Sequence, residues 1–175
     1  SGPFIDIGAA DGFFAIGAVI SGIADETYAF EVDDLSRCSI AINAIDNNIS
    51  ERIHIREIAN TQTISDVLKK ERKAKILIDI EGGEYELLDY DFLDEISKCD
   101  VIVELHPSLI ESGLKKQEEL ITRLENYFHI EFFKKSSIRT TTFPELANLS
   151  DDKRLLALSE NRAFEMWWIK LNPKT

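Results

Sequence analysis

The sequence predicts an α/β protein with a doubly wound, largely parallel sheet and helices on both faces. Apolar segments of strand length alternate with amphipathic segments of helix length, and this alternation is typical of such sheets. Segment 75–80 is mostly apolar, as expected for a strand that is buried on both faces. The length of 175 residues fits a single domain with a core of its own.

The strands are short apolar runs, and we expect seven of them, at residues 3–8, 27–31, 52–56, 75–80, 100–105, 129–134 and 164–171. The helices are expected at residues 12–21, 34–47, 65–72, 84–97, 117–127 and 151–159. Helix 65–72 is expected to take Thr63 as its N-cap, and helix 84–97 to break near residues 89–91. The spacing of three and four residues in helix 34–47 places four apolar side chains on one face, namely Leu35, Cys38, Ile42 and Ile45.

The composition is that of an acidic globular protein. Thirty-two acidic residues against 20 basic ones give a net charge of −12. Such a charge repels phosphate backbones, so we expect no nucleic-acid partner. No apolar run reaches the roughly 20 residues that span a bilayer, so we expect no membrane partner either. Cys38 and Cys99 form no disulfide framework, and free thiols favour a cytoplasmic location. The sequence leaves the oligomeric state open.

The loop after the first strand has the form of a nucleotide-binding turn. It consists of Gly8, Ala9, Ala10, Asp11 and Gly12. Gly8 permits a tight turn, Ala10 allows close approach of a ligand, and Asp11 can cap the following helix. Glu31 ends the second strand 23 residues after Gly8, where an acid can bind both hydroxyls of a ribose. Together the two features predict an adenosine-containing ligand.

Charge decides which adenosine ligand fits. Asp6 and Asp11 lie where a pyrophosphate would bind, and no Lys or Arg is near them in the sequence. Unpaired like charges in a partly dry site cost several kcal/mol. S-adenosylmethionine has no phosphate and carries two cationic groups, so it suits an acidic rim. The predicted cofactor residues are therefore Asp6, Gly8, Ala9, Ala10, Asp11, Gly12 and Glu31.

Polar side chains follow the fourth and fifth strands. Asp79 and Glu81 lie two residues apart, as do Glu104 and His106, so each pair shares one face of its strand. The fourth strand commonly lies between the first and the fifth in such sheets, and neighbouring strands are ~4.8 Å apart. We therefore expect the four side chains to converge beside the methionine end of the cofactor.

The four segments together resemble the FkbM-type family of class I S-adenosylmethionine-dependent methyltransferases. They are residues 4–12, Glu31, residues 78–84 and residues 103–107, and Asp-Ile-Glu-Gly-Gly-Glu is the most specific motif. The resemblance implies a Rossmann-like sheet of seven strands with an antiparallel last strand. It covers residues 4–171, and we expect one methyltransferase domain over residues 1–175 that lacks an N-terminal segment. Ala10 departs from the family, which more often has Asn there.

The resemblance implies O-methylation of a hydroxyl on a sugar, polysaccharide or secondary metabolite. The acceptor is then a small molecule or glycan, and S-adenosylmethionine is the cofactor. The catalytic side carries over to Asp79, Glu81 and His106, with Asp79 also near the cofactor. His106 is the expected general base, because its ordinary pKa is ~6.5. Glu104 is expected to orient it, and Asp79 or Glu81 is the second choice of base.

Three other functions remain open from the sequence. Asp79, Glu81, Glu104 and His106 could instead ligate Mg²⁺ or Mn²⁺ in a metal-assisted O-methyltransferase, although no metal ligand is assigned. The chain could bind an adenosyl cofactor without catalysis. A nicotinamide oxidoreductase is disfavoured by the acids of the first loop and by its missing glycines.

Overall fold

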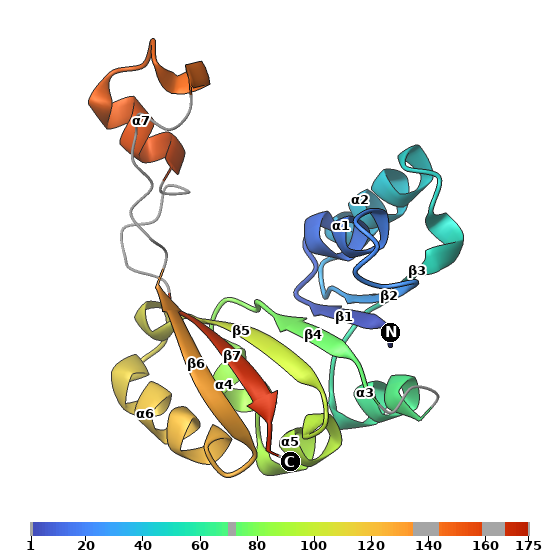
Figure 1. The fold of residues 1–175 in the computed structure, drawn as a ribbon, viewed down its shortest axis with the longest axis vertical. Helices are drawn as coiled ribbons and strands as arrows, with labels where there is room; N and C mark the ends of the chain where they lie inside the picture. The colour runs from blue at the N-terminus through green and yellow to red at the C-terminus, as the bar shows by residue number, and fades with distance from the viewer. Residues whose placement is uncertain (1, 70–72, 135–143, 159–166, 175) are drawn as a thin grey trace.

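One seven-stranded sheet forms the centre of the molecule (Figure 1). The computed structural model describes residues 2–69, 73–134, 144–158 and 167–174. The strand order is β3-β2-β1-β4-β5-β7-β6. The strands are β1 Phe4–Ile7, β2 Thr27–Phe30, β3 Ile53–Arg56, β4 Lys75–Ile78, β5 Asp100–Leu105, β6 Phe128–Lys134 and β7 Trp167–Pro173. β7 is antiparallel to β5 and β6, and the other pairings are parallel, which confirms the predicted fold class.

Helices α1 to α6 lie against the two faces of this sheet, whereas α7 projects away from it (Figure 1). The helices are α1 Phe13–Ile20, α2 Asp34–Asp46, α3 Thr61–Leu68, α4 Glu84–Leu87, α5 Tyr90–Ile96, α6 Gly113–Leu124 and α7 Asp151–Leu158. Short 3-10 turns lie at Ser50–Arg52, Pro107–Leu109 and Pro144–Leu146. Within the described ranges, no helix has the length and apolar character needed to cross a membrane.

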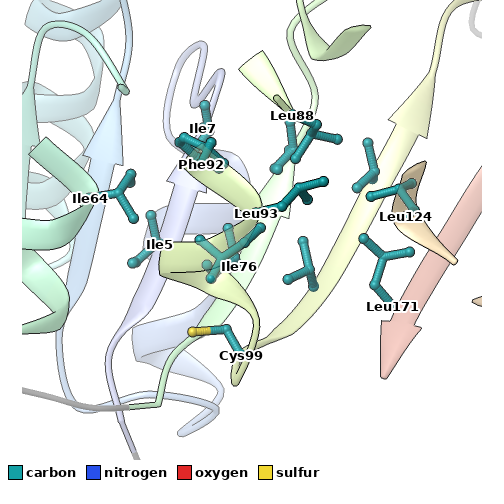
Figure 2. Close-up of a cluster of buried hydrophobic side chains, with 14 of the residues drawn as sticks. Ile5, Ile7, Ile64, Ile76, Leu88, Phe92, Leu93, Cys99, Leu124 and Leu171 are labelled. Carbon is teal, nitrogen blue, oxygen red and sulfur yellow. The ribbon is translucent and has the colours of Figure 1, made fainter. Parts of the chain in front are cut away.

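Two apolar clusters hold the helices against the sheet. One joins α3, α5 and α6 to the strands through residues such as Ile64, Phe92 and Leu124 (Figure 2). The other joins α1 and α2 to the opposite face, through Ile16 and Ile40 among others. Burial of an aliphatic or aromatic side chain contributes about 1.5–3 kcal/mol, so the sheet and its strand ends rest on two well-packed layers.

The apolar stripe predicted to share one face of helix 34–47 faces solvent. Leu35, Ile42 and Ile45 are 78%, 57% and 62% exposed, and Cys38 is also exposed. α2 is instead buried through Ile40 and Ala44, because the small Ala44 lets the helix approach the sheet closely. Periodicity revealed an apolar stripe, but α2 carries a second one, and tertiary packing selects between them.

Other element boundaries differ in detail. α3 begins at Thr61, and its N-cap is Asn60, not Thr63. The Asn60 side chain accepts from the Thr63 backbone N–H and the Thr63 hydroxyl accepts from the Asn60 backbone N–H, so the pair forms a reciprocal capping box. The predicted break near residues 89–91 is confirmed by the boundary between α4 and α5. Residues 164–166 of the predicted last strand, residues 70–72 of helix 65–72 and residue 159 of helix 151–159 lie outside the described residues.

The strand order places the site. β1 pairs with β2 on one side and with β4 on the other, so the direction of winding reverses at β1. In open α/β sheets, ligands bind beyond the carboxyl ends of the strands at this reversal. The loops after β1, β2 and β4 therefore meet where the sequence analysis expected the cofactor.

Candidate functional site

A pocket of about 740 Å³ opens beyond the carboxyl ends of β1, β2 and β4. Its walls come from the loop after β1, the end of β2, the loop between β3 and α3, and the segment from the end of β4 into α5. Six acidic residues line it, namely Glu31, Glu57, Asp79, Glu81, Glu86 and Asp89. No Lys or Arg is among the described residues that line it, so the pocket favours a cationic ligand over a phosphate-bearing one.

Gly8 holds the first loop against the end of β4. A side chain at this position would place its Cβ 1.9 Å from the carbonyl oxygen of Asp79, and the backbone has a φ of +88°. Both conditions require glycine. The Gly8 backbone N–H also donates to the Phe30 carbonyl at 2.9 Å. Gly8 therefore brings the ends of β1, β2 and β4 together at one wall of the pocket.

Glu31 closes the same wall from β2. Its carboxylate accepts hydrogen bonds from the Ala10 backbone N–H at 2.8 Å and from the Asp33 backbone N–H at 2.9 Å. Each oxygen has a further lone pair, and Glu31 lines the pocket. Glu31 therefore still presents hydrogen-bond acceptors to a ligand. It also fixes the first loop, and the sequence pattern did not reveal this second role.

Asp6 lies beneath this loop and does not line the pocket. It is only 1% exposed. Burial raises the pKa of Asp6 to about 7, against a backbone hydrogen bond from Ala15 that lowers it, and the charges of Asp79 and Glu31 raise it further. Its Oδ2 has no hydrogen-bond partner in the structure, so Asp6 carries unsatisfied acceptor capacity directly below the site.

The predicted cofactor residues divide into two groups. Gly8, Ala10, Glu31 and Asp79 line the pocket, whereas Asp6, Ala9, Asp11 and Gly12 do not. Ala9 packs in the cluster under α1. Asp11 accepts from the Phe13 backbone N–H at 3.3 Å, and Gly12 occupies the N-cap position of α1. These residues shape the turn that carries the lining residues.

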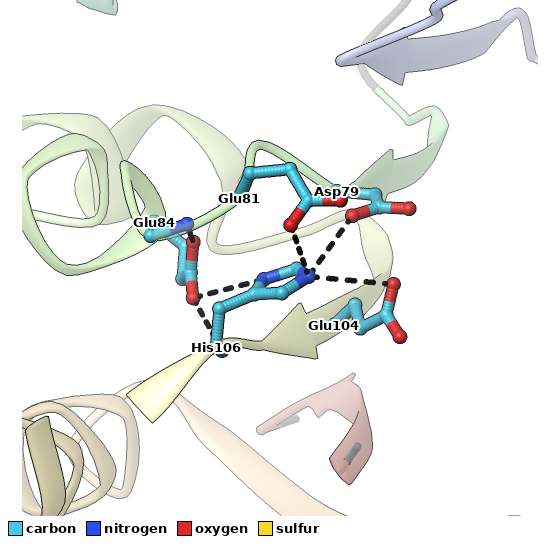
Figure 3. A network of polar contacts seen from close by, with 6 residues as sticks. Asp79, Glu81, Glu84, Glu104 and His106 are labelled. Atoms are coloured by element: carbon cyan, nitrogen blue, oxygen red, sulfur yellow. Dashed lines mark hydrogen bonds and ion pairs between the residues drawn. The ribbon is translucent and has the colours of Figure 1, made fainter. Parts of the chain in front are cut away.

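His106 lies at the centre of a carboxylate cluster, as Figure 3 shows. Its Nε2 is 3.4 Å from Asp79 Oδ1, 3.5 Å from Glu81 Oε2 and 3.6 Å from Glu104 Oε2. The prediction that Asp79, Glu81, Glu104 and His106 converge is therefore confirmed. Only Asp79 and Glu81 among them line the pocket.

Glu84 fixes the orientation of the imidazole. Its Oε1 accepts from the His106 backbone N–H at 2.7 Å and lies 3.3 Å from His106 Nδ1, while its Oε2 accepts from the Gly82 backbone N–H at 2.9 Å. Glu84 is fully buried. Sequence reasoning treated Glu84 only as the first-turn acid of a helix. The signal that could have revealed its role at the site is its position in the most specific motif.

The electrostatics of the cluster bear on the choice of base. Burial lowers the pKa of His106, but contacts with Glu104 and Glu84 and the charge of Glu81 raise it to about 10. His106 therefore holds its proton at neutral pH when no cation competes for it. Burial, followed by the neighbouring Glu104, raises the pKa of Asp79 above its ordinary value. Of the candidate bases, His106 is buried behind the pocket wall, whereas Asp79 lines it.

The loop after β3 was missed as part of the site. Glu57, Ile58, Ala59, Asn60 and Thr61 all line the pocket. The rule that placed functional residues at the ends of the first, second and fourth strands applies equally to the third, and Glu57 directly follows Arg56 at its end. Val32, Leu87 and Phe92 provide apolar lining, and no short motif marks them.

Several solved structures with the same fold are described as methyltransferases. The B. subtilis tRNA methyltransferase TrmK superposes with a TM-score of 0.61 at 13% identity, over 98% of this chain and 60% of TrmK. A putative O-methyltransferase from Klebsiella pneumoniae gives a TM-score of 0.63 at 11% identity, over 98% and 73%. An rRNA methylase from Streptococcus thermophilus gives a TM-score of 0.59 at 10% identity, over 100% and 88%.

No protein-family model matches the sequence, and a search of the curated proteins found no match either. The fold is thus one that this chain shares with known methyltransferases, while membership of the FkbM-type family is not shown. At these identities the likeness concerns the fold.

The expectation of no nucleic-acid partner, which was drawn from the net charge, was wrong. Proteins with the same fold include tRNA and rRNA methyltransferases. Net charge governs non-specific attraction over the whole surface, but it does not identify the acceptor of one site. The chain also spans only 60% of the length of TrmK, so such proteins contain further chain beyond the shared part.

Proposed function

We propose that this chain is an S-adenosylmethionine-dependent methyltransferase that methylates a hydroxyl group. The observation that carries the proposal is the pocket at the sheet reversal, which six carboxylates line and which no Lys or Arg lines among the described residues. Nucleotides with two or three phosphates fit such a lining poorly. The methyltransferase fold of the structural neighbours supports the same reading.

The residues present fit the cofactor. Gly8 lines the pocket, and Glu31 offers two oxygens to the ribose hydroxyls. Asp79 lines the pocket and suits the cationic methionine end, with the buried Asp6 close to it. Val32 and Ile58 supply apolar lining for the base. When bound, the cofactor supplies a methyl group on a cationic sulfur.

The acceptor hydroxyl belongs beside Asp79 and Glu81, which face the pocket where the cluster begins. With the cofactor bound, the acceptor oxygen would accept its methyl group, and the hydroxyl proton would have to leave. Asp79 takes the hydroxyl proton, since it lines the pocket while His106 is buried behind it. A positioned base contributes ~10²–10⁴-fold. His106 lies behind Asp79, with its Nε2 3.4 Å from Asp79 Oδ1, and Glu84 orients the imidazole.

The acceptor class follows from the resemblance to FkbM-type enzymes, which implies a hydroxyl on a sugar, polysaccharide or secondary metabolite. RNA belongs in the same acceptor panel because structural neighbours methylate tRNA and rRNA. If the chain methylates RNA and none of the sugar, polysaccharide or secondary-metabolite acceptors, this acceptor assignment is wrong. The proposal that the chain transfers a methyl group would still stand.

Calorimetry with S-adenosylhomocysteine tests the proposal. The wild-type chain is expected to bind it, and Glu31→Gln to bind it at least about tenfold more weakly, because a hydrogen bond to a charged group is worth about 1.5–3 kcal/mol. Glu118→Gln makes the same charge change at an exposed position on α6 and should bind like wild type.

A wild-type chain that binds no adenosyl ligand would remove the proposal. Binding without methylation of any acceptor in the panel would favour the non-catalytic cofactor-binding alternative. Tighter binding of a nicotinamide dinucleotide than of S-adenosylhomocysteine would favour an oxidoreductase.

A further inference from the structure

We propose that Asp79, Glu104 and His106 form a site for one divalent cation at the back of the pocket, best suited to Mn²⁺. One oxygen of each carboxylate and one ring nitrogen of the histidine lie within 4.8 Å of one another. The three side chains come from the ends of the adjacent strands β4 and β5, which pair in parallel register. A rigid sheet edge therefore presents all three donors to the same point.

The distances suit a cation between the donors. Bonds of about 2.2 Å at right angles place neighbouring ligand atoms about 3.1 Å apart. Nε2 of His106 lies 3.4 Å from Asp79 Oδ1 and 3.6 Å from Glu104 Oε2. Inward movement of a few tenths of an ångström would bring both oxygens to this separation from Nε2. The same distances are too long for good N–H···O hydrogen bonds.

The buried imidazole is the independent observation that points to a ligand. His106 is fully buried, and its Nε2 has no hydrogen-bond partner in the structure. Asp79 Oδ1, which faces it, has none either. Buried polar atoms are normally hydrogen-bonded. Figure 3 shows Nε2 directed toward the three carboxylates, where a cation would satisfy Nε2 and Asp79 Oδ1 together.

Glu84 prepares the histidine for this role. Its Oε1 lies 3.3 Å from Nδ1, so in the neutral ring Nδ1–H donates to Glu84 and the lone pair of Nε2 points to the cation. Histidines that bind metals almost always donate their other N–H to a carboxylate or carbonyl. The Glu84 carboxylate is itself fixed by the Gly82 and His106 backbone N–H groups, as expected for an outer-shell ligand.

The donor set selects the ion. Mg²⁺ prefers oxygen ligands alone, whereas sites rich in imidazole or thiolate suit Zn²⁺ and later metals. One nitrogen with two or three carboxylate oxygens lies between these cases and suits Mn²⁺. Glu81, whose Oε2 is 3.5 Å from Nε2, is the nearest additional ligand, and it lies on the pocket side, where an acceptor oxygen would also reach the cation.

The catalytic consequence rests on the proposed function. A cation at this point would hold the acceptor oxygen and favour loss of its proton to Asp79. Binding of the cation itself does not depend on any cofactor.

The site is tested by titrating the chelator-treated full chain with Mn²⁺ alone. Binding is measured as the loss of the electron paramagnetic resonance signal of free Mn²⁺. Wild type is expected to bind one equivalent saturably. Glu104→Gln should abolish this binding, and Glu84→Gln should weaken it about 10–100-fold. Glu86→Gln removes one acid that lines the pocket outside the cluster and should leave Mn²⁺ affinity unchanged.

Absence of saturable Mn²⁺ binding to wild type overturns the proposal, as does equal binding by folded Glu104→Gln. If Glu104→Gln fails to fold, Asp79→Asn replaces it, and the wild-type stoichiometry decides independently. Parallel calorimetry with S-adenosylhomocysteine separates the two proposals. Mn²⁺ binding without S-adenosylhomocysteine binding keeps the cation site and overturns the methyltransferase function, and the reverse result overturns only the cation site.

Discussion

Ala10 lies at the pocket, and its backbone has an unfavourable left-handed conformation. It lines the pocket, donates its backbone N–H to Glu31, and has a φ of 48°. The left-handed region costs an ordinary residue roughly 1–2 kcal/mol, and asparagine tolerates it best among residues with a Cβ. The Asn that FkbM-type enzymes more often have at this position therefore has a physical reason.

Ala10→Asn is expected to raise the free energy of unfolding by up to about 1 kcal/mol, measured by urea denaturation. Asn48 is the matched control, because it is exposed and has a φ of 57°. Asn48→Ala should lower the free energy of unfolding by a similar amount. A destabilised Ala10→Asn beside a destabilised Asn48→Ala would show that side-chain space, and not backbone strain, limits position 10.

Local sequence rules predicted which polar side chains lie near one another at the strand ends. Alternation along the strands predicted that Asp79 and Glu81 share one face and converge with Glu104 and His106. The four side chains do converge, but Glu81 reaches the cluster from the turn after β4, where its φ is 51°, and not by strand alternation. Burial depth was not predictable in this way. Asp6 and His106 are adjacent to the pocket but behind its wall, because depth depends on how loops from several elements pack over the strand ends.

At the scale of elements, the contact between the loop after β1 and the end of β4 fixes the site. Gly8→Ala would place a Cβ 1.9 Å from the Asp79 carbonyl oxygen. Backbone cannot move aside as a flexible side chain can, so the free energy of unfolding should fall by at least about 2 kcal/mol. S-adenosylhomocysteine affinity should fall as well, because the loop must shift away from β4.

Gly17→Ala in α1 is the matched control for Gly8→Ala. A Cβ at Gly17 meets no atom within 4 Å, and alanine favours a helix over glycine by about 0.5–1 kcal/mol. Urea denaturation should therefore show opposite signs for the two substitutions. If both stabilise the chain, the close approach of the two loops is not a constraint in solution.

Helix existence was easier to predict than helix orientation. The apolar spacing of three and four residues predicted a helix over residues 34–47, close to the observed α2 Asp34–Asp46. It could not select the buried stripe, because Ala44 contributes little hydrophobicity and is buried for its small size. Similarly, the capping box of Asn60 and Thr63 begins α3 at Thr61, earlier than apolar periodicity alone suggested.

At the scale of the whole molecule, stability should depend on the acids and the histidine buried near the site. The pKa of Asp6 is about 7 in the folded chain against an ordinary value of 3.8. A raised pKa means that the folded state favours the protonated carboxyl. The contribution of Asp6 to stability is thus fully present below about pH 4 and is lost as the pH rises through about 7. Asp79 and His106, whose pKa values are also raised, act in the same direction.

Asp6→Asn isolates the contribution of this carboxyl. The amide oxygen can still accept a hydrogen bond from the Ala15 backbone, and the amide does not ionise over this pH range. Relative to wild type, its free energy of unfolding should rise between pH 5 and pH 8 by up to a few kcal/mol, at about 1.4 kcal/mol for each pKa unit of difference between the folded and unfolded states. Urea denaturation at both pH values measures this difference. Asp66→Asn, at an exposed acid paired with Lys69 whose pKa is lowered, should show no such rise. An Asp6→Asn profile parallel to wild type would mean that Asp6 is already ionised at pH 5 in the folded chain, and that water or a bound cation reaches it below the loop.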